Sequence, residues 1–340
     1  MAATAYINSI GKREDLSDII AVVDAKETVL TSSIKKQGKK PASAYVEWQV
    51  DSYGSVNTGG TVDGTDVAFA GAEDYASNRA RIGTYIQQFR RTPGVTRLEE
   101  VVANVAGLEY ADPQGVAGAT EFARAKAKAT VQIKRDVEAT LLSANSAQAD
   151  TGTVPYKTRG LGKWLSTTAD SPALGQASVL LNSAQIYSGT LAAFTEDSFR
   201  SLLQQRWSVT GRGGDLLGIV GSDLKNTISD FSRYLPAKTI NSATASAVRF
   251  YNAQIADKSI STSVDIYSGD FGSIELHLSA FIGSTKQGYI IDPEFVELRT
   301  HTAPYFTELP DLGAGRRGIV ETIVAFVPTN PQAHAYIAAT

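Results

Sequence analysis

The chain of 340 residues contains no cysteine and only three histidines. The absence of cysteine excludes disulfides, thiolate nucleophiles and cysteine-based metal sites. The histidines, His277, His301 and His334, are far apart in the sequence and do not form a metal-ligand spacing such as H-E-x-x-H. A histidine-based catalytic site would therefore have to be assembled entirely by the fold.

The sequence also lacks a large excess of positive or negative charge and has no long apolar run. The formal net charge is −3 with 20% charged residues, which does not point to nucleic acid as a partner. No run of about 18 apolar residues and no charged-then-apolar leader is present, so we expect neither a membrane span nor a secretory signal, and we expect synthesis in the cytosol. The hydrophobic fraction of 43% is enough for two domains with cores.

The longest helical pattern runs from Gly115 to Asn145. Its apolar residues recur at steps of three or four, whereas four charged residues fall elsewhere on the helix. The stripe consists of Phe122, Ala125, Ala129, Ile133, Val137 and Leu141, and the charged residues are Arg124, Lys128, Arg135 and Glu138. A helix of this length would extend for roughly 40 Å. It is interpreted either as a strut or as an ordinary long core helix.

The N-terminal segment begins with polar residues 1–14, followed by a short amphipathic pattern. The apolar positions of that pattern are Leu16, Ile19, Ile20 and Val23, which predicts an arm that carries one helix. A small basic cluster then ends at Pro41 and comprises Lys35, Lys36, Lys39 and Lys40. It would serve either as a contact to nucleic acid or an acidic neighbour, or as a solvated turn.

From residue 45 to residue 51 the apolar residues alternate, which predicts a half-buried strand. Residues 52–78 are rich in Gly, Ser, Thr and Asp and hold too few large apolar residues for a core of their own. Gly59-Gly60 and Asp63-Gly64 are turn signals, so we expect a long two-stranded excursion. A strand-like pattern resumes at Arg81 and continues to about Ala106.

Residues 148–176 have the composition of a loop and mark a candidate boundary between two compact parts. The next part alternates helix and strand: Thr195 is expected to cap a helix, and Ser222 a second one. The buried stripe expected for the first helix is Phe199, Leu202, Leu203 and Trp207. Strands are expected at 216–220, 274–282, 289–298 and 318–327.

The chemical signals in the sequence are weak. The turn Gly211–Gly214 could cradle an anion, but it lacks the Gly-Lys-Ser/Thr of a phosphate loop. Ser33 and Lys36 match S-x-x-K without the companion motifs of serine acylases. Several arginines, Arg79, Arg81, Arg90, Arg91 and Arg97, could contact a neighbouring chain or phosphates, or pair with Glu73, Asp74, Glu99 and Glu100. Composition and periodicity therefore predict a soluble α+β protein with a strut and a long ordered excursion, without an evident catalytic site.

Four segments in a fixed order carry a family resemblance. They are KREDLSDII near the N-terminus, YVEWQVD at 45–51, KRDVEATLL at 134–142 and IIDPEFVELRTHTAPYFTELP at 290–310. Together they resemble tailed-bacteriophage major capsid proteins with the Hong Kong 97-type fold. The resemblance implies an N-terminal arm (1–44), an extended loop (45–80), a peripheral domain with a long spine helix (81–155 and 286–340) and an axial domain (156–285).

The resemblance also implies the function. Such a protein is no enzyme and needs no cofactor, and it self-assembles through hexameric and pentameric capsomers into an icosahedral head shell around double-stranded DNA, which is bound without sequence specificity. Its other partners would be a portal protein and possibly separate scaffolding and decoration proteins; no membrane is involved. Because the arm begins close to Met1, scaffolding would be a separate protein or absent. The subunit would assemble in the host cytoplasm and remain in the virion.

The residues expected at contacts between subunits come from the arm and the extended loop. They are Lys35, Lys36, Tyr53, Val67, Phe69, Tyr75, Arg79 and Arg81. Some shells of this fold are cross-linked through a lysine of the extended loop. Here no lysine occurs between Lys40 and Lys126, so we expect a noncovalent shell.

Two other functions remain open at this point. A cellular nanocompartment shell of the same fold would package an enzyme cargo, which mass spectrometry of purified particles would reveal in place of DNA and phage structural proteins. An enzyme of unknown type would remain a small oligomer at high concentration.

Overall fold

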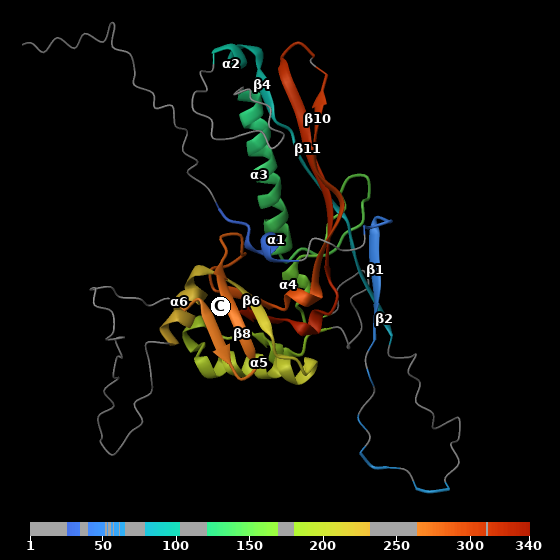
Figure 1. The fold of residues 1–340 in the computed structure, drawn as a ribbon, viewed down its shortest axis with the longest axis vertical. Coiled ribbons are helices and arrows are strands. Elements are labelled where there is room, and N and C mark those ends of the chain that lie inside the picture. Colours follow the sequence, from blue (N-terminus) through green and yellow to red (C-terminus); the bar gives the residue numbers. More distant parts are fainter. Residues whose placement is uncertain are drawn as a thin grey trace, which may run out of the picture. The chain divides into compact units, whose positions relative to one another are not determined.

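A computed structural model gives the fold of the chain (Figure 1). It describes residues 26–34, 40–51, 79–102, 121–168, 180–231, 264–310 and 312–340, together with Tyr53, Val56, 58–60 and 62–64. Among these, two compact units are distinguished by their internal contacts. One contains residues 91–131 and 306–320, and the other contains residues 26–90, 132–305 and 321–340.

The larger unit contains a six-stranded mixed sheet in the order β5-β12-β9-β6-β8-β7. Its strands are β5 (Ile186–Tyr187), β6 (Asp215–Val220), β7 (Ile266–Gly269), β8 (Gly272–Leu278), β9 (Gln287–Ile291) and β12 (Ala335–Ala338). Strand β6 pairs parallel with β8 and antiparallel with β9. Its apolar side chains are buried, as expected for a strand in the middle of a sheet.

Helices α5 (Glu196–Thr210) and α6 (Ser222–Phe231) pack on this sheet and share one core with it. Thr195 caps α5, because its hydroxyl accepts the N–H of Ser198 at 3.3 Å. The helix ends at Gly211, whose φ of 65° permits its N–H to bond the carbonyl of Trp207. The glycine turn therefore terminates a helix, and the predicted cap at Thr195, the strand and the second helix are confirmed. Ser222 was expected to cap the second helix, but it is the first residue of α6, and the Lys225 N–H bonds the carbonyl of the preceding Gly221.

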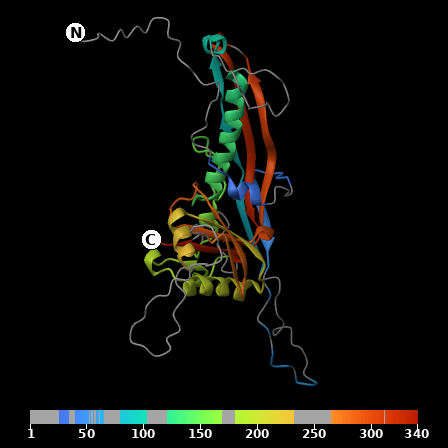
Figure 2. The ribbon, with the colours of Figure 1, turned by 60° about the vertical axis from the view of Figure 1, so that its left-hand side comes forward.

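Two further sheets are built from residues distant in sequence. The four-stranded sheet has the order β10-β11-β3, with β4 paired to β11. Its strands are β3 (Gln87–Arg91), β4 (Gly94–Thr96), β10 (Val296–Leu309) and β11 (Gly315–Pro328), and Figure 2 shows β10 and β11 alongside each other. The two-stranded sheet pairs β1 (Tyr45–Val50) with β2 (Ala80–Tyr85) antiparallel. The expected two-stranded excursion is thus confirmed where the chain leaves and returns, in the pairing of β1 with β2.

Helix α3 (Glu121–Leu141) is the longest helix in the described part of the chain. It ends at Leu141, four residues before the predicted end, and residues 115–120 lie outside the described residues. Phe122, Ile133, Val137 and Leu141 of the predicted stripe are buried. The placement of Glu138 away from the buried face was wrong, since this residue is 0% exposed.

Short helices complete the fold. They are α1 (Val29–Ser33), α2 (Arg97–Val102), α4 (Leu161–Trp164) and the single 3₁₀ turns Ser183–Gln185, Leu191–Ala193, Pro293–Phe295 and Pro331–Ala333. The strand-like interpretation of 97–102 was wrong, because these residues form α2 and Leu98 is 75% exposed. The expected helix over residues 16–23 lies outside the described residues.

Two other predictions of burial were wrong. Trp207 was expected in the core of α5, but it is 43% exposed and the buried position belongs to Arg206. The strand predicted over residues 274–282 ends at Leu278, which is 55% exposed. In α5 the apolar pattern failed because the fold buries Arg206 and leaves Trp207 partly exposed.

Candidate functional sites

The described residues hold no arrangement of side chains typical of catalysis. His277 lies 3.2 Å from Glu275 at the surface, His301 contacts Thr302, and His334 is fully buried elsewhere. Within the same residues, no group of three or more potential metal ligands is close enough to hold an ion. Nor does any helix in that part of the chain have the length and hydropathy needed to cross a membrane.

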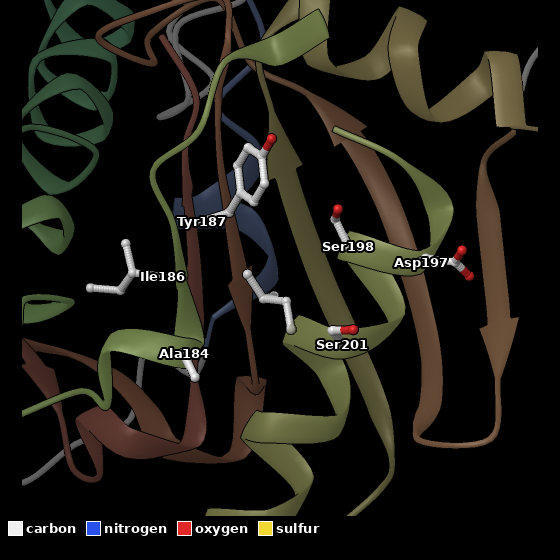
Figure 3. Close-up of a pocket in the computed structure, with 7 residues that line it drawn as sticks. Ala184, Ile186, Tyr187, Asp197, Ser198 and Ser201 are labelled. Carbon is white, nitrogen blue, oxygen red and sulfur yellow. The ribbon is translucent and has the colours of Figure 1, made fainter. Parts of the chain in front are cut away.

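One open pocket of about 370 Å³ lies beside α5 and β5 (Figure 3). Ile186 and Tyr187 come from β5, Asp197, Ser198, Ser201 and Leu202 from α5, and Ala184 from the preceding turn. The Tyr187 hydroxyl donates to the Thr190 carbonyl at 2.9 Å, and Ser198 Oγ lies 3.1 Å from the Thr195 hydroxyl. The lining contains no histidine or lysine to activate a serine. This pocket does not support covalent catalysis.

The excursion between β1 and β2 is the first candidate surface for binding another chain. Beyond the last pair of the ladder, Val50 with Ala80, Asp51 and Arg79 form an exposed ion pair at 3.4 Å. Large apolar side chains follow in the described part of the excursion and are almost fully exposed. These are Tyr53 (99%), Val56 (89%) and Val62 (80%). Gly60 and Gly64 have φ values of 63° and 80°, consistent with the predicted turns.

The base of this hairpin is fixed to other elements of the larger unit by a buried polar contact. Thr84 Oγ1 accepts the N–H of Arg159 at 2.9 Å and lies 3.3 Å from Thr158 Oγ1. Thr158 Oγ1 in turn accepts the N–H of Phe326 at 3.2 Å. Strand β2 is thereby linked to β11 through residues 158–159, and the hairpin leaves the subunit from an immobilised base.

Arg159 strengthens this base from within the core. Its side chain is 0% exposed, donates from Nη1 to the carbonyl of Gly83 at 3.2 Å, and lies over the Trp164 ring at 4.6 Å. The Trp164 ring also packs on Trp48 of β1, with centroids 5.4 Å apart. A Cβ at Gly83 would approach the backbone carbonyl oxygen of Val46 to 2.8 Å, so the close approach of β2 to β1 requires glycine there.

The second candidate lies at α1, in the N-terminal part of the chain. Glu138 of α3 accepts the N–H of Leu30 through Oε1 and the N–H of Thr31 through Oε2, both at 2.8 Å. Both donors belong to the first turn of α1, where backbone N–H groups lack partners within the helix. The pKa of Glu138 is raised, because the effect of burial outweighs the opposite effect of the hydrogen bonds from α1.

A third buried network supports the six-stranded sheet. Arg206 donates from Nε to the Ala333 carbonyl at 2.6 Å, from Nη1 to the Arg212 carbonyl at 3.2 Å and from Nη2 to Asp292 Oδ2 at 3.0 Å. The N–H of Asp292 donates to Nδ1 of His334 at 3.1 Å. The side chains of Arg206, Asp292 and His334 are buried, so the network has a role in stability.

The expected contact residues are only partly described. Tyr53 is exposed, Arg79 pairs with Asp51, and Arg81 is an exposed residue of β2 opposite Gln49. Lys35, Lys36, Val67, Phe69 and Tyr75 lie outside the described residues. Arg90 pairs with Glu321 at 3.0 Å and Arg79 with Asp51, partners other than the predicted Glu73, Asp74, Glu99 and Glu100.

The sequence did not indicate the roles of Glu138, Arg159 and Arg206. Each is a charged residue whose partners are remote in sequence; the donors to Glu138, for example, lie 107 and 108 residues away. The one local signal was the position of Glu138 beside the apolar Val137 and Leu141.

A family model described as "SU10 major capsid protein" matches residues 2–340. No curated protein matches the chain. Among solved structures, the capsid of a native GTA particle is similar, with a TM-score of 0.57 and 12% identity over 100% of this chain and 99% of that one.

Two phage capsids show the same fold. The capsid of the cyanophage P-SCSP1u has a TM-score of 0.53 and 9% identity, over 96% of this chain and 93% of that chain. The capsid of the Myoviridae phage XM1 has a TM-score of 0.51 and 11% identity, over 96% and 97%. The expected Hong Kong 97-type fold class is thus confirmed.

Proposed function

Because this chain belongs to the SU10 major capsid protein family, and so is a head-shell protein and not an enzyme, we propose that its shell forms through two extensions, the N-terminal arm and the β1–β2 excursion. The protein is a structural component of the virion and assembles with copies of itself into a shell. The two extensions would lie on neighbouring subunits and hold the shell together.

The observation that supports this proposal is that the hairpin has a buried, fixed base and exposed apolar side chains beyond it. Its base is fixed by buried contacts of Thr84 and Arg159, whereas Tyr53, Val56 and Val62 expose nearly their whole side chains. A two-stranded hairpin is marginally stable alone, and exposed apolar side chains grouped in one segment are typical of a binding surface. A neighbouring copy is the surface that a shell always provides.

The proposed domain organisation follows the family resemblance. Residues 1–44 form the arm, 45–80 the extended loop, 81–155 with 286–340 the peripheral domain, and 156–285 the axial domain. Helix α3 would be the spine helix of the peripheral domain. Helices α5 and α6 with strands β5, β6, β7 and β8 would belong to the axial domain, and β9 and β12, which come from residues 286–340, would complete its sheet.

The proposed assembly has partners beyond the subunit itself. Hexameric and pentameric capsomers would form in the host cytoplasm, with a portal protein and possibly separate scaffolding and decoration proteins. Double-stranded DNA would be enclosed without sequence-specific contacts, in keeping with a net charge of −3 and the absence of a basic excess.

Negative-stain microscopy of the expressed protein tests the proposal. We expect shells, tubes or capsomer rings from the natural chain, and soluble subunits without shells from a Val56→Asp/Val62→Asp variant. Thr58→Asp is the matched control, since it adds a charge to the same excursion at a position that is already polar and exposed. A natural chain that remains a small oligomer at high concentration would overturn the proposal. If the double variant forms normal shells, the β1–β2 excursion is not needed to hold the shell together.

A further inference from the structure

The contact between α1 and α3 has an apolar part and a polar part. Leu30 is 0% exposed and Ile34 is 4% exposed, so the short helix presents its apolar residues to the subunit's own core. The buried carboxylate of Glu138 accepts two neighbouring backbone N–H groups of the same helix, each at 2.8 Å. The segment is thus held by apolar contacts and by a two-point polar contact.

In the polar contact, the two N–H donors of α1 face the two oxygens of one carboxylate. An ionised carboxylate has an acceptor for each of the two N–H donors, and hydrogen bonds to a charged acceptor are stronger than those between neutral groups. A buried carboxylate without such donors would be destabilising, since desolvation of a charge is costly. Glu138 and the first turn of α1 therefore depend on each other.

We propose that Glu138 is a positioning residue that fixes residues 26–34 on the subunit's own α3, so that this segment stays with its own subunit in the assembled shell. This inference rests on the proposed function of the arm. The arm would then reach a neighbour from a fixed point, and the direction in which it leaves the subunit would be set by the turn of α1 bound to Glu138.

The isosteric variant Glu138→Gln isolates the polar contact from the packing. Glutamine keeps the shape of the side chain but offers one carbonyl acceptor, and its amide group would face an N–H donor. One of the two α1 N–H groups therefore loses its partner. Asp136→Asn is the matched control, because it makes the same carboxylate-to-amide change two residues away on α3, where Asp136 contacts the Gln132 side chain.

Hydrogen exchange of assembled shells and of free subunits measures the contact. We expect the amides of Leu30 and Thr31 to be protected in both forms of the natural chain. In Glu138→Gln their exchange should be roughly tenfold faster or more, with α3 residues 121–137 unchanged and with no effect of Asp136→Asn. Unchanged exchange at Leu30 and Thr31 in Glu138→Gln would overturn the proposal, as would loss of protection throughout α3.

A cross-linking experiment tests whether the segment stays on its own subunit, and the absence of native cysteine gives it a clean background. Ser32→Cys and Ala139→Cys, both at exposed positions, would be combined in one chain and joined in shells with a short bismaleimide. We expect a band at the mass of one chain on a denaturing gel and, after proteolysis, a cross-linked peptide pair that contains positions 32 and 139. A ladder of multimers, or the absence of any cross-link, would show that α1 does not sit on its own α3. Failure of the proposed function would appear separately, as an absence of shells despite an intact α1 contact in free subunits.

Discussion

Asp292 and His334 are joined by one hydrogen bond, in which the backbone N–H of Asp292 donates to Nδ1 of His334 over 3.1 Å. Nδ1 can accept this bond only while it carries no proton. Burial, and then the nearby Arg206 cation, lower the pKa of His334 from 6.5 to about 3. Between these two values the residue is neutral in the folded subunit and cationic in the unfolded chain.

His334 therefore makes the subunit sensitive to acid. Because its pKa is lower when folded, the unfolded chain binds the extra proton, and stability should fall from about pH 6.5 to about pH 3 by up to about 1.4 kcal/mol per pH unit. His334→Asn keeps an acceptor for the Asp292 N–H and does not titrate. Its free energy of unfolding in urea should be lower at pH 7 but should decline less towards pH 4. Parallel pH profiles for the two proteins would contradict this assignment.

Ile133→Asp should prevent the recovery of soluble subunits. Ile133 is 1% exposed on α3, and an unpaired carboxylate there would cost several kcal/mol against a typical stability of roughly 5 to 15 kcal/mol. Val131→Asp places the same charge on the same helix at a side chain that is 50% exposed, and it should be tolerated. Soluble yield and circular dichroism distinguish the two variants. Equal yields would mean that the buried face of α3 is misassigned.

Arg159→Gln should loosen the base of the β1–β2 hairpin. The change removes the donor to the Gly83 carbonyl and the cation over Trp164, at an expected loss of about 2 to 4 kcal/mol in the free energy of unfolding. Amide exchange in Ala80–Tyr85 should accelerate at the same time. Arg79→Gln removes only an exposed ion pair with Asp51 and should change stability by less than about 1 kcal/mol. If both variants behave alike, Arg159 does not hold the hairpin.

The mature shell should contain no covalent links between subunits. The chain has no cysteine, and no lysine occurs between Lys40 and Lys126 to supply an amine in the extended loop. Particles boiled in detergent should give one band near 36.2 kDa on a denaturing gel. Multimers that survive boiling would mean that lysines of the arm, or lysines after Lys126, form a cross-link.

Local patterns in the sequence were sufficient for most elements. The apolar repeat of α3 correctly placed Ile133, Val137 and Leu141 in the core, because a helix returns to the same face every three to four residues whatever packs against it. The cap at Thr195 was predictable for a similar reason, since its partner, the N–H of Ser198, lies three residues away. The family resemblance then led to the shell function, which composition and periodicity alone did not indicate.

The tertiary structure alone decided where the buried charges lie. Arg206 occupies the core of α5 where the pattern favoured Trp207, because the carbonyl of Ala333 and the carboxylate of Asp292 satisfy its guanidinium. The burial of Glu138 likewise depends on N–H groups of α1 more than 100 residues away. The apolar periodicity of the sequence determines which positions of a helix or strand share one face. A charged side chain, however, can be buried only where the fold supplies its partners, and those partners are distant in the chain.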